Sequence, residues 1–203
     1  MRRDFQLTYL ARHLNQLPDE IARTLKALEQ TRRHAAFQAA LFGEAKPSLS
    51  AFHAFTFDAG VYPARWYFSG RYQFAKHYYP LPGELKPELD GEETVCAIEI
   101  DRLPEVKHWV RNLERQPETS FWLPTSTDRF YPDFVAELAD GRLLVVEYKG
   151  SHLVNADDAR EKRDIGAVWA AASKGRCLFK MVTDATAAGK SVEAQLRETL
   201  SGK

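Results

Sequence analysis

The sequence has no excess of charge of either sign. Lys and Arg together number 28 among the 203 residues, and Asp and Glu also number 28, which leaves a formal net charge of zero. Proteins that coat nucleic acid through bulk charge are strongly basic. This class is therefore disfavoured, and any contact with a phosphate backbone must use a local basic surface.

Cysteines and long apolar runs are also scarce. The two cysteines, Cys96 and Cys177, lie in apolar runs without the spacing of a zinc site, so we expect two reduced thiols. No apolar run approaches the roughly 20 residues that a membrane span needs. The first residues, Met1 to Asp4, lack the apolar core of a secretory signal. We therefore expect a cytoplasmic protein with no membrane segment.

The composition is that of a globular protein, with 44% hydrophobic and 28% charged residues, and we expect three segments. Residues 1–45 have apolar residues at helical spacing, interrupted at Pro18, which predicts two helices meeting near Leu17. Residues 46–90 form an aromatic-rich segment, with a hairpin predicted across Ser69-Gly70 and a linker. Its aromatic rings can stack on bases, but a half-buried sheet face is the commoner explanation.

Residues 91–203 alternate between helical and strand-like patterns. This order predicts an α/β fold, in which a mixed sheet is flanked by helices. The expected helices span Glu92–Leu103, Asp157–Lys174 and Val192–Leu200, and the expected strands span Val106–Arg111, Ser120–Leu123, Phe130–Leu138, Leu143–Lys149 and Cys177–Val182.

Two of these strands bring charged residues to one end of a predicted hairpin. Asp140-Gly141 suits a tight turn, because both residues tolerate a positive φ. Side chains alternate along a strand, so Glu147 and Lys149 project from the same face. Counting back from the turn places Asp133 near the same open end. The sequence therefore predicts two neighbouring carboxylates with a lysine beside them.

This combination suits metal-assisted hydrolysis of a phosphodiester bond. Neighbouring carboxylates repel each other, and a divalent cation such as Mg²⁺ relieves the repulsion because it prefers carboxylate oxygens. Lys149 can then orient the attacking water or offset charge on the phosphate. The simpler alternative is a solvated Glu-Lys pair at the end of a hairpin, with an aspartate near it.

The same residues resemble a known family. Pro132-Asp133, Glu147 and Lys149 resemble the PD-(D/E)xK signature of the restriction-endonuclease-like fold. Five longer stretches resemble the C-terminal nuclease domain of type III restriction enzyme Res subunits, namely residues 106–112, 120–124, 130–134, 146–150 and 161–169. The resemblance implies an endodeoxyribonuclease that uses Mg²⁺, or Mn²⁺ in its place. It also implies an acidic ligand on the preceding helix, where Glu93 is the positional match and Glu92 and Glu99 are alternatives.

Several residues are candidates for contact with the substrate, which we expect to be DNA. Lys162 lies on the inner face of its predicted helix, and the resemblance supports a role at the site. His152 and Asn155 follow the catalytic strand on a loop, where functional residues concentrate. Arg111, at the end of an expected strand, is a further candidate for contact with the substrate.

The sequence leaves the partner and the activity open. Res subunits also contain a helicase motor, whereas Gly189-Lys190-Ser191 fails the spacing of a phosphate-binding loop because Asp184 stands where glycine is required. We therefore expect either a stand-alone nuclease or a piece that works with a helicase or methyltransferase subunit. The alternative function is a non-catalytic interaction or DNA-binding module, and an RNA substrate is a further alternative.

Overall fold

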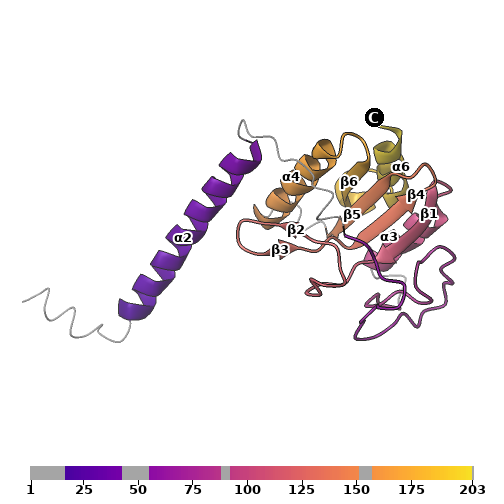
Figure 1. The fold of residues 1–203 in the computed structure, drawn as a ribbon, viewed down its shortest axis with the longest axis horizontal. Coiled ribbons are helices and arrows are strands. Elements are labelled where there is room, and N and C mark those ends of the chain that lie inside the picture. The colour runs from indigo at the N-terminus through magenta and orange to yellow at the C-terminus, as the bar shows by residue number, and fades with distance from the viewer. Residues whose placement is uncertain (1–16, 43–54, 88–91, 151–156, 203) are drawn as a thin grey trace, which may run out of the picture. The chain divides into compact units, whose positions relative to one another are not determined.

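The computed structural model describes residues 17–42, 55–87, 92–150 and 157–202, and it divides the chain into two compact units, residues 1–45 and 46–203 (Figure 1). In the first unit, α2 (Leu17–Phe42) begins where the sequence predicts a helix junction. Its exposed apolar residues Ile21, Leu25 and Leu28 recur at helical spacing. The helix expected before Leu17 lies outside the described residues.

The second unit is built on a four-stranded mixed sheet with the order β1-β4-β5-β6. Strand β4 is antiparallel to both of its neighbours, β1 and β5, and β6 is parallel to β5. Their bounds are β1 (Val106–Arg111), β4 (Phe134–Leu138), β5 (Leu143–Lys149) and β6 (Cys177–Thr183). A separate antiparallel pair is formed by β2 (Leu123–Pro124) and β3 (Arg129–Phe130).

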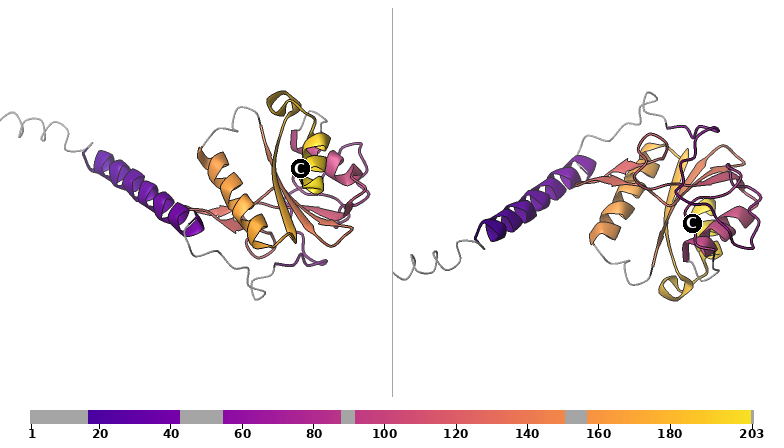
Figure 2. Two further views of the ribbon diagram at one scale, coloured as in Figure 1. Left: turned by 90° about the horizontal axis from the view of Figure 1, so that it is seen from above. Right: turned by 90° about the horizontal axis from the view of Figure 1, so that it is seen from below.

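Helices cover both faces of the sheet, which confirms the predicted α/β class (Figure 2). One face is covered by α3 (Glu92–Arg102) and α6 (Val192–Ser201), and the other by α4 (Asp157–Ala172). A single turn, α5 (Ala185–Ala188), connects β6 to α6. No helix among the described residues is long and apolar enough to cross a membrane.

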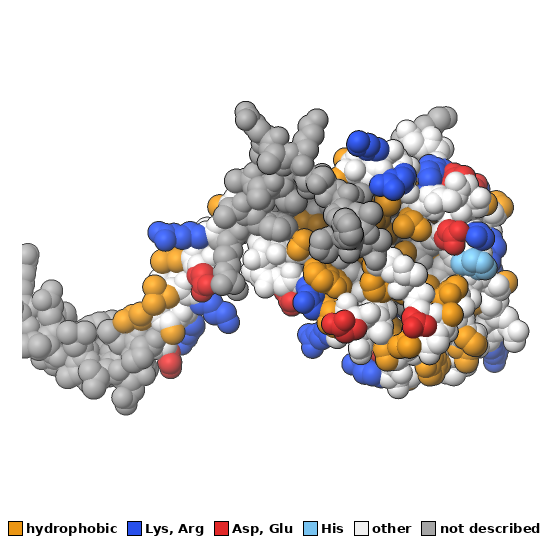
Figure 3. Space-filling model, viewed as in Figure 1, with side chains coloured by type: hydrophobic (Ala, Val, Ile, Leu, Met, Phe, Trp, Pro, Cys, Tyr) orange, Lys and Arg blue, Asp and Glu red, His pale blue; other side chains and the backbone are white. Residues whose placement is uncertain are grey.

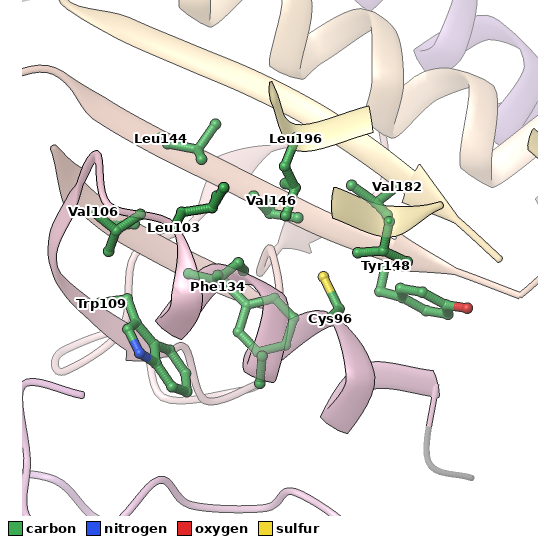
Figure 4. Packing of buried hydrophobic residues seen from close by; sticks show 14 of the residues in the cluster. Cys96, Leu103, Val106, Trp109, Phe134, Leu144, Val146, Tyr148, Val182 and Leu196 are labelled. Carbon is green, nitrogen blue, oxygen red and sulfur yellow. The ribbon is translucent and has the colours of Figure 1, made fainter. Parts of the chain in front are cut away.

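The main hydrophobic core lies between the sheet and the α3–α6 layer (Figure 4). Strand β5 contributes Leu144, Val146 and Tyr148, which alternate with residues that face α4. Cys96 is buried in the same core and forms no disulfide. The odd-numbered residues of β5, which include Glu147 and Lys149, therefore project from the opposite face of the sheet.

The hairpin between β4 and β5 forms at the predicted turn. Gly141 has a φ of 84°, in the left-handed region that glycine adopts without strain. The Asp140 carboxylate accepts hydrogen bonds from the backbone and side chain of Arg142, at 3.0 and 2.7 Å. Because Phe134 pairs with Val146, the next residues outward, Asp133 and Glu147, stand opposite each other.

The aromatic hairpin predicted across Ser69-Gly70 does not form, and residues 55–87 contain no regular strand. Instead, Tyr67 forms an isolated bridge with Gly83. Pro80 and Pro82 have no N–H to donate to a ladder. Phe68 and Phe74 pack against the core, and Trp109 in β1 bonds through its backbone to residues 76 and 78. Tertiary packing, not local strand pairing, therefore determines the course of this segment.

The strand expected over residues 120–123 begins only at Leu123. The side chain of Asn112 explains the difference, because it bonds both the N–H and the carbonyl of Phe121, at 2.9 and 2.8 Å. These bonds satisfy the backbone of Phe121 without a partner strand.

Candidate functional site

Asp133 and Glu147 meet at the open end of the β4–β5 hairpin. Asp133 directly precedes β4, and its Oδ2 accepts a hydrogen bond from the backbone N–H of Tyr148 at 2.7 Å. Only 8% of Asp133 and 5% of Glu147 are exposed. The hairpin therefore holds two carboxylates close together, as the sequence predicts, and the fold keeps both largely away from solvent.

Glu147 is the less well compensated of the two. Its Oε2 is buried and has no hydrogen-bond partner among the described residues. Burial, and secondarily the charge of Asp133, raise the pKa of Glu147 well above its usual range, while Lys162 and Lys149 oppose the shift. A buried carboxylate with an unpartnered oxygen is costly unless a ligand or a proton satisfies it.

Two lysines approach this carboxylate pair from different elements. Lys149 ends β5, and its Nζ lies 3.7 Å from Glu147 Oε1 and 3.9 Å from Asp158 Oδ2, too far for a hydrogen bond to either. Lys162 comes from α4, pairs with Asp158 at 3.0 Å, and lies over the Phe130 ring. Burial lowers the pKa of Lys162, but Glu147 and Asp158 offset this and leave it raised. Lys149 and Lys162 therefore both lie beside the carboxylate pair, one from β5 and one from α4.

Arg111 ends β1 and connects two acidic residues from different parts of the fold. Its Nη1 donates to Asp133 Oδ1 at 2.8 Å and to the Asp133 carbonyl at 2.9 Å. Its Nη2 donates to Glu93 Oε2 at 2.6 Å. The guanidinium is buried over the Phe134 ring, and its Nε has no partner among the described residues. Arg111 is thus the cation that neutralises Asp133 and Glu93 in this structure.

Glu93 reaches the site from the first turn of α3, on the side that the sequence predicts. Burial raises the pKa of Glu93, and the charge of Arg111 opposes the shift. Of the two alternatives, Glu92 lines the same cleft, whereas Glu99 pairs with Arg102 at 3.2 Å. The structure therefore brings Glu93 to the site, but as a partner of Arg111.

These residues line a cleft of about 730 Å³. Its charged lining is nearly balanced, with six acidic and five basic residues: Glu84, Glu92, Glu93, Glu114, Asp133 and Glu147, against Arg65, Lys86, Arg111, Lys149 and Lys162. The face of the molecule in Figure 3 likewise intersperses acidic and basic side chains over the described residues. The cleft combines a carboxylate pair with two lysines, but the lining residues that the structure describes form no strongly basic wall.

Two residues of this region, Asn112 and Trp66, are not among the candidate site residues named from the sequence. Asn112 cross-links the site, because its Nδ2 donates to the carbonyls of Phe121 and Pro132, both at 2.8 Å. Trp66 lines the cleft from the aromatic segment. Asn112 adjoins Arg111 within a stretch that carries the family resemblance, which is a usable signal. For Trp66 the sequence offers only the general signal that aromatic rings of its segment can stack on bases. Its place in the cleft depends on long-range packing.

Two candidate substrate contacts, His152 and Asn155, lie outside the described residues. Within those residues, no three or more His, Cys, Asp or Glu side chains form a group that could hold a metal ion. Mg²⁺ commonly uses only one or two protein carboxylates and keeps several waters. The donor chemistry of Asp133 and Glu147, with the orphaned Glu147 Oε2, fits that smaller requirement.

Comparisons with known proteins add no relative. No family model, no curated protein and no solved structure matched the chain significantly.

Proposed function

We propose that this protein is a metal-dependent nuclease that hydrolyses phosphodiester bonds in DNA, with a restriction-endonuclease-like arrangement of its mixed sheet. One observation carries the proposal: a buried carboxylate oxygen of Glu147 has no hydrogen-bond partner among the described residues, and it lies beside Asp133 in a cleft that two lysines also line. A simple solvated Glu-Lys pair does not bury a carboxylate in this way.

Asp133 and Glu147 would hold Mg²⁺, or Mn²⁺ in its place. Bound there, the metal would supply Lewis-acid polarisation of the phosphoryl oxygen and lower the pKa of a water. The resemblance implies Glu93 as a further ligand. Because its Oε2 bonds to Arg111 in this structure, we propose that Glu93 supports the site through Arg111.

The surrounding groups have roles that follow from their contacts. The Tyr148 N–H and Arg111 Nη1 hold the two oxygens of Asp133, so its carboxylate is oriented before any ligand arrives. Lys149 would orient the attacking water or offset negative charge on the phosphate. Lys162 would contact a phosphate oxygen from the α4 side.

The direct test is DNA cleavage by the purified chain with Mg²⁺ on linear and circular substrates. We expect Asp133→Asn and Glu147→Gln to lower the rate by about 100-fold or more, because each removes charge stabilisation at the reacting group. Glu137→Gln is the matched control, since Glu137 lies on β4 but pairs with Lys107 away from the cleft. Cleavage that survives in the Asp133 variant, or no cleavage by wild type, contradicts the proposal.

One observation favours a second candidate, a non-catalytic interaction or DNA-binding module serving a helicase or methyltransferase partner. Arg111 forms ion pairs with both Asp133 and Glu93. A site that has lost its metal needs such a cation to neutralise its carboxylates. Calorimetric titration with Mg²⁺ and Mn²⁺ separates the candidates. A nuclease binds metal in a manner that depends on Glu147, whereas the module shows no such binding. An RNA substrate in the same cleavage assay tests the remaining alternative.

A further inference from the structure

Trp66 occupies an unusual position for a tryptophan in this protein. Trp109 donates to Asp101 in the core at 2.8 Å, Trp122 lies under the guanidinium of Arg129, and Trp169 packs against Phe121. Trp66, in contrast, is 42% exposed and lines the cleft that contains Asp133 and Glu147. A large aromatic surface is thus presented to whatever enters the candidate active site.

The backbone that carries Trp66 is held in place. The Trp66 carbonyl accepts a hydrogen bond from the N–H of Glu84 at 3.1 Å. On its other side, Arg65 donates to both oxygens of Glu84, at 2.9 and 2.7 Å. Because the backbone is cross-linked before binding, ligand contact with the ring requires little further ordering.

The charge of the cleft limits how it can bind a polyanion. Among the described residues, the six acidic and five basic side chains that line it nearly cancel, and the whole chain has a net charge of zero. Counterion release, which dominates binding by basic proteins, requires many uncompensated Lys or Arg contacts. Affinity for a nucleic acid must therefore come largely from contacts other than ion pairs, and stacking on an aromatic ring is such a contact.

The burial of the carboxylates favours an unpaired strand. Asp133 and Glu147 are only 8% and 5% exposed, so the scissile phosphate has to enter the cleft. A duplex is stiff, with a persistence length of about 150 base pairs, and its bases are stacked on one another. A single strand bends into a cleft and turns its bases outward to stack on a protein ring.

We propose that Trp66 is a stacking platform for an unpaired nucleobase, and that the cleft accordingly binds single-stranded nucleic acid. The inference rests on the proposed function only in taking a phosphodiester as the ligand of Asp133 and Glu147. Stacking does not distinguish DNA from RNA, so the shared ligand chemistry is an unpaired nucleotide.

The test measures binding of a fluorescent single-stranded oligothymidylate to the full chain in EDTA, by fluorescence anisotropy. We expect Trp66→Ala to weaken binding by about tenfold or more, and Trp66→Phe, which keeps a π face, by about threefold or less. Tyr67→Ala is the matched control, because Tyr67 is adjacent and 48% exposed but does not line the cleft. Its binding should equal that of wild type.

Three companion measurements sharpen the result. A duplex of the same length should bind more weakly than the single strand. Because ion pairs contribute little, affinity should fall only shallowly with salt, and Trp66→Ala should leave that slope unchanged. An oligouridylate of equal length should lose affinity in Trp66→Ala to a similar extent, because stacking does not depend on the sugar.

Each outcome either supports or overturns the platform. Wild-type affinity in Trp66→Ala, equal losses in Trp66→Ala and Tyr67→Ala, a preference for duplex, or no binding by wild type overturns it. Because the assay omits metal, it is independent of cleavage. Binding that depends on Trp66 without Mg²⁺-dependent cleavage would leave the platform standing and refute the nuclease.

Discussion

The backbone N–H of Tyr148 donates a hydrogen bond to Oδ2 of Asp133 at 2.7 Å. This bond joins β5 to the residue that precedes β4, at the end of the hairpin where Glu147 also lies. Arg111 holds the other oxygen, Oδ1, at 2.8 Å. Asp133 is therefore oriented from two sides, whereas Oε2 of its neighbour Glu147 has no partner among the described residues.

The contact between Glu93 and Arg111 predicts different effects for two substitutions of Glu93. Glu93→Gln keeps an oxygen that can accept from Arg111 Nη2, so we expect Mg²⁺ affinity to stay within about threefold of wild type. Glu93→Ala removes that acceptor and should cost about tenfold, as is usual for partners of metal-binding groups. Calorimetry in Mg²⁺ provides the measurement. A loss in Glu93→Gln as large as in Glu147→Gln would instead make Glu93 a direct ligand.

The buried carboxylate of Glu147 predicts that Glu147→Gln stabilises the metal-free protein at neutral pH. The folded-state pKa of Glu147 is raised above its unfolded value. Its ionisation therefore favours the unfolded state as pH rises above the unfolded pKa of about 4.3. Glutamine does not ionise, so the variant should melt at a higher temperature than wild type at pH 7 in EDTA.

The same substitution should show a defined pH dependence. The difference in melting temperature between Glu147→Gln and wild type should narrow as pH falls toward the unfolded-state pKa of glutamate. At that pH wild-type Glu147 becomes neutral in both the folded and the unfolded state. Glu137→Gln, at an exposed position on β4, is the control and should show no comparable gap. A lower melting temperature for Glu147→Gln at pH 7 contradicts this account.

The burial of His77 predicts that the protein loses stability in acid. Its Nε2 accepts from the Arg111 N–H at 3.2 Å, its Nδ1 lies 2.8 Å from the Tyr79 carbonyl, and burial lowers its pKa to about 4. Because the folded pKa lies below the unfolded value of about 6.5, the neutral ring contributes stability above pH 6.5. That stability is lost as pH falls toward 4, by about 3 kcal/mol at about 1.4 kcal/mol per pKa unit.

Substituting His77 isolates this contribution. His77→Phe keeps a ring against Trp109 but leaves the Arg111 N–H unpaired, so we expect a loss of about 1–3 kcal/mol at pH 7. Its stability should then change less than that of wild type between pH 6.5 and 4. Urea unfolding at several pH values measures both effects, and equal pH profiles for the two proteins would show that another group is responsible.

The packing of α4 on the sheet predicts that Gly166→Ala is destabilising. A Cβ at Gly166 would lie 2.3 Å from the Phe179 ring on β6. Overpacking of this kind costs about 1–3 kcal/mol, which exceeds the gain of about 1 kcal/mol from replacing a helical glycine. Denaturant unfolding should show the loss, and combining the variant with Phe179→Leu should recover part of it. Since α4 also carries Lys162, cleavage should fall in the single variant.

Much of the second unit was predictable from local sequence. The bounds of α3, β1, β5 and α6 agree with the predicted ones to within one residue. Asp133 and Glu147 converge because a single short hairpin separates them, and its Asp140-Gly141 turn is visible in the sequence. Contacts that depend on periodicity and on one nearby turn need no knowledge of the distant chain.

The tertiary structure decided the rest. The packing of α3, β1 and the aromatic segment places Arg111 between Glu93 and Asp133. It also places Trp66 in the cleft that these residues line. The same packing replaces the expected hairpin over residues 65–74, because the aromatic rings gain more by covering Trp109 and the core than by pairing locally. By itself, then, the sequence determined which residues share a strand face and a hairpin end. Only the fold decided which charges neutralise each other, because those partners come from distant segments.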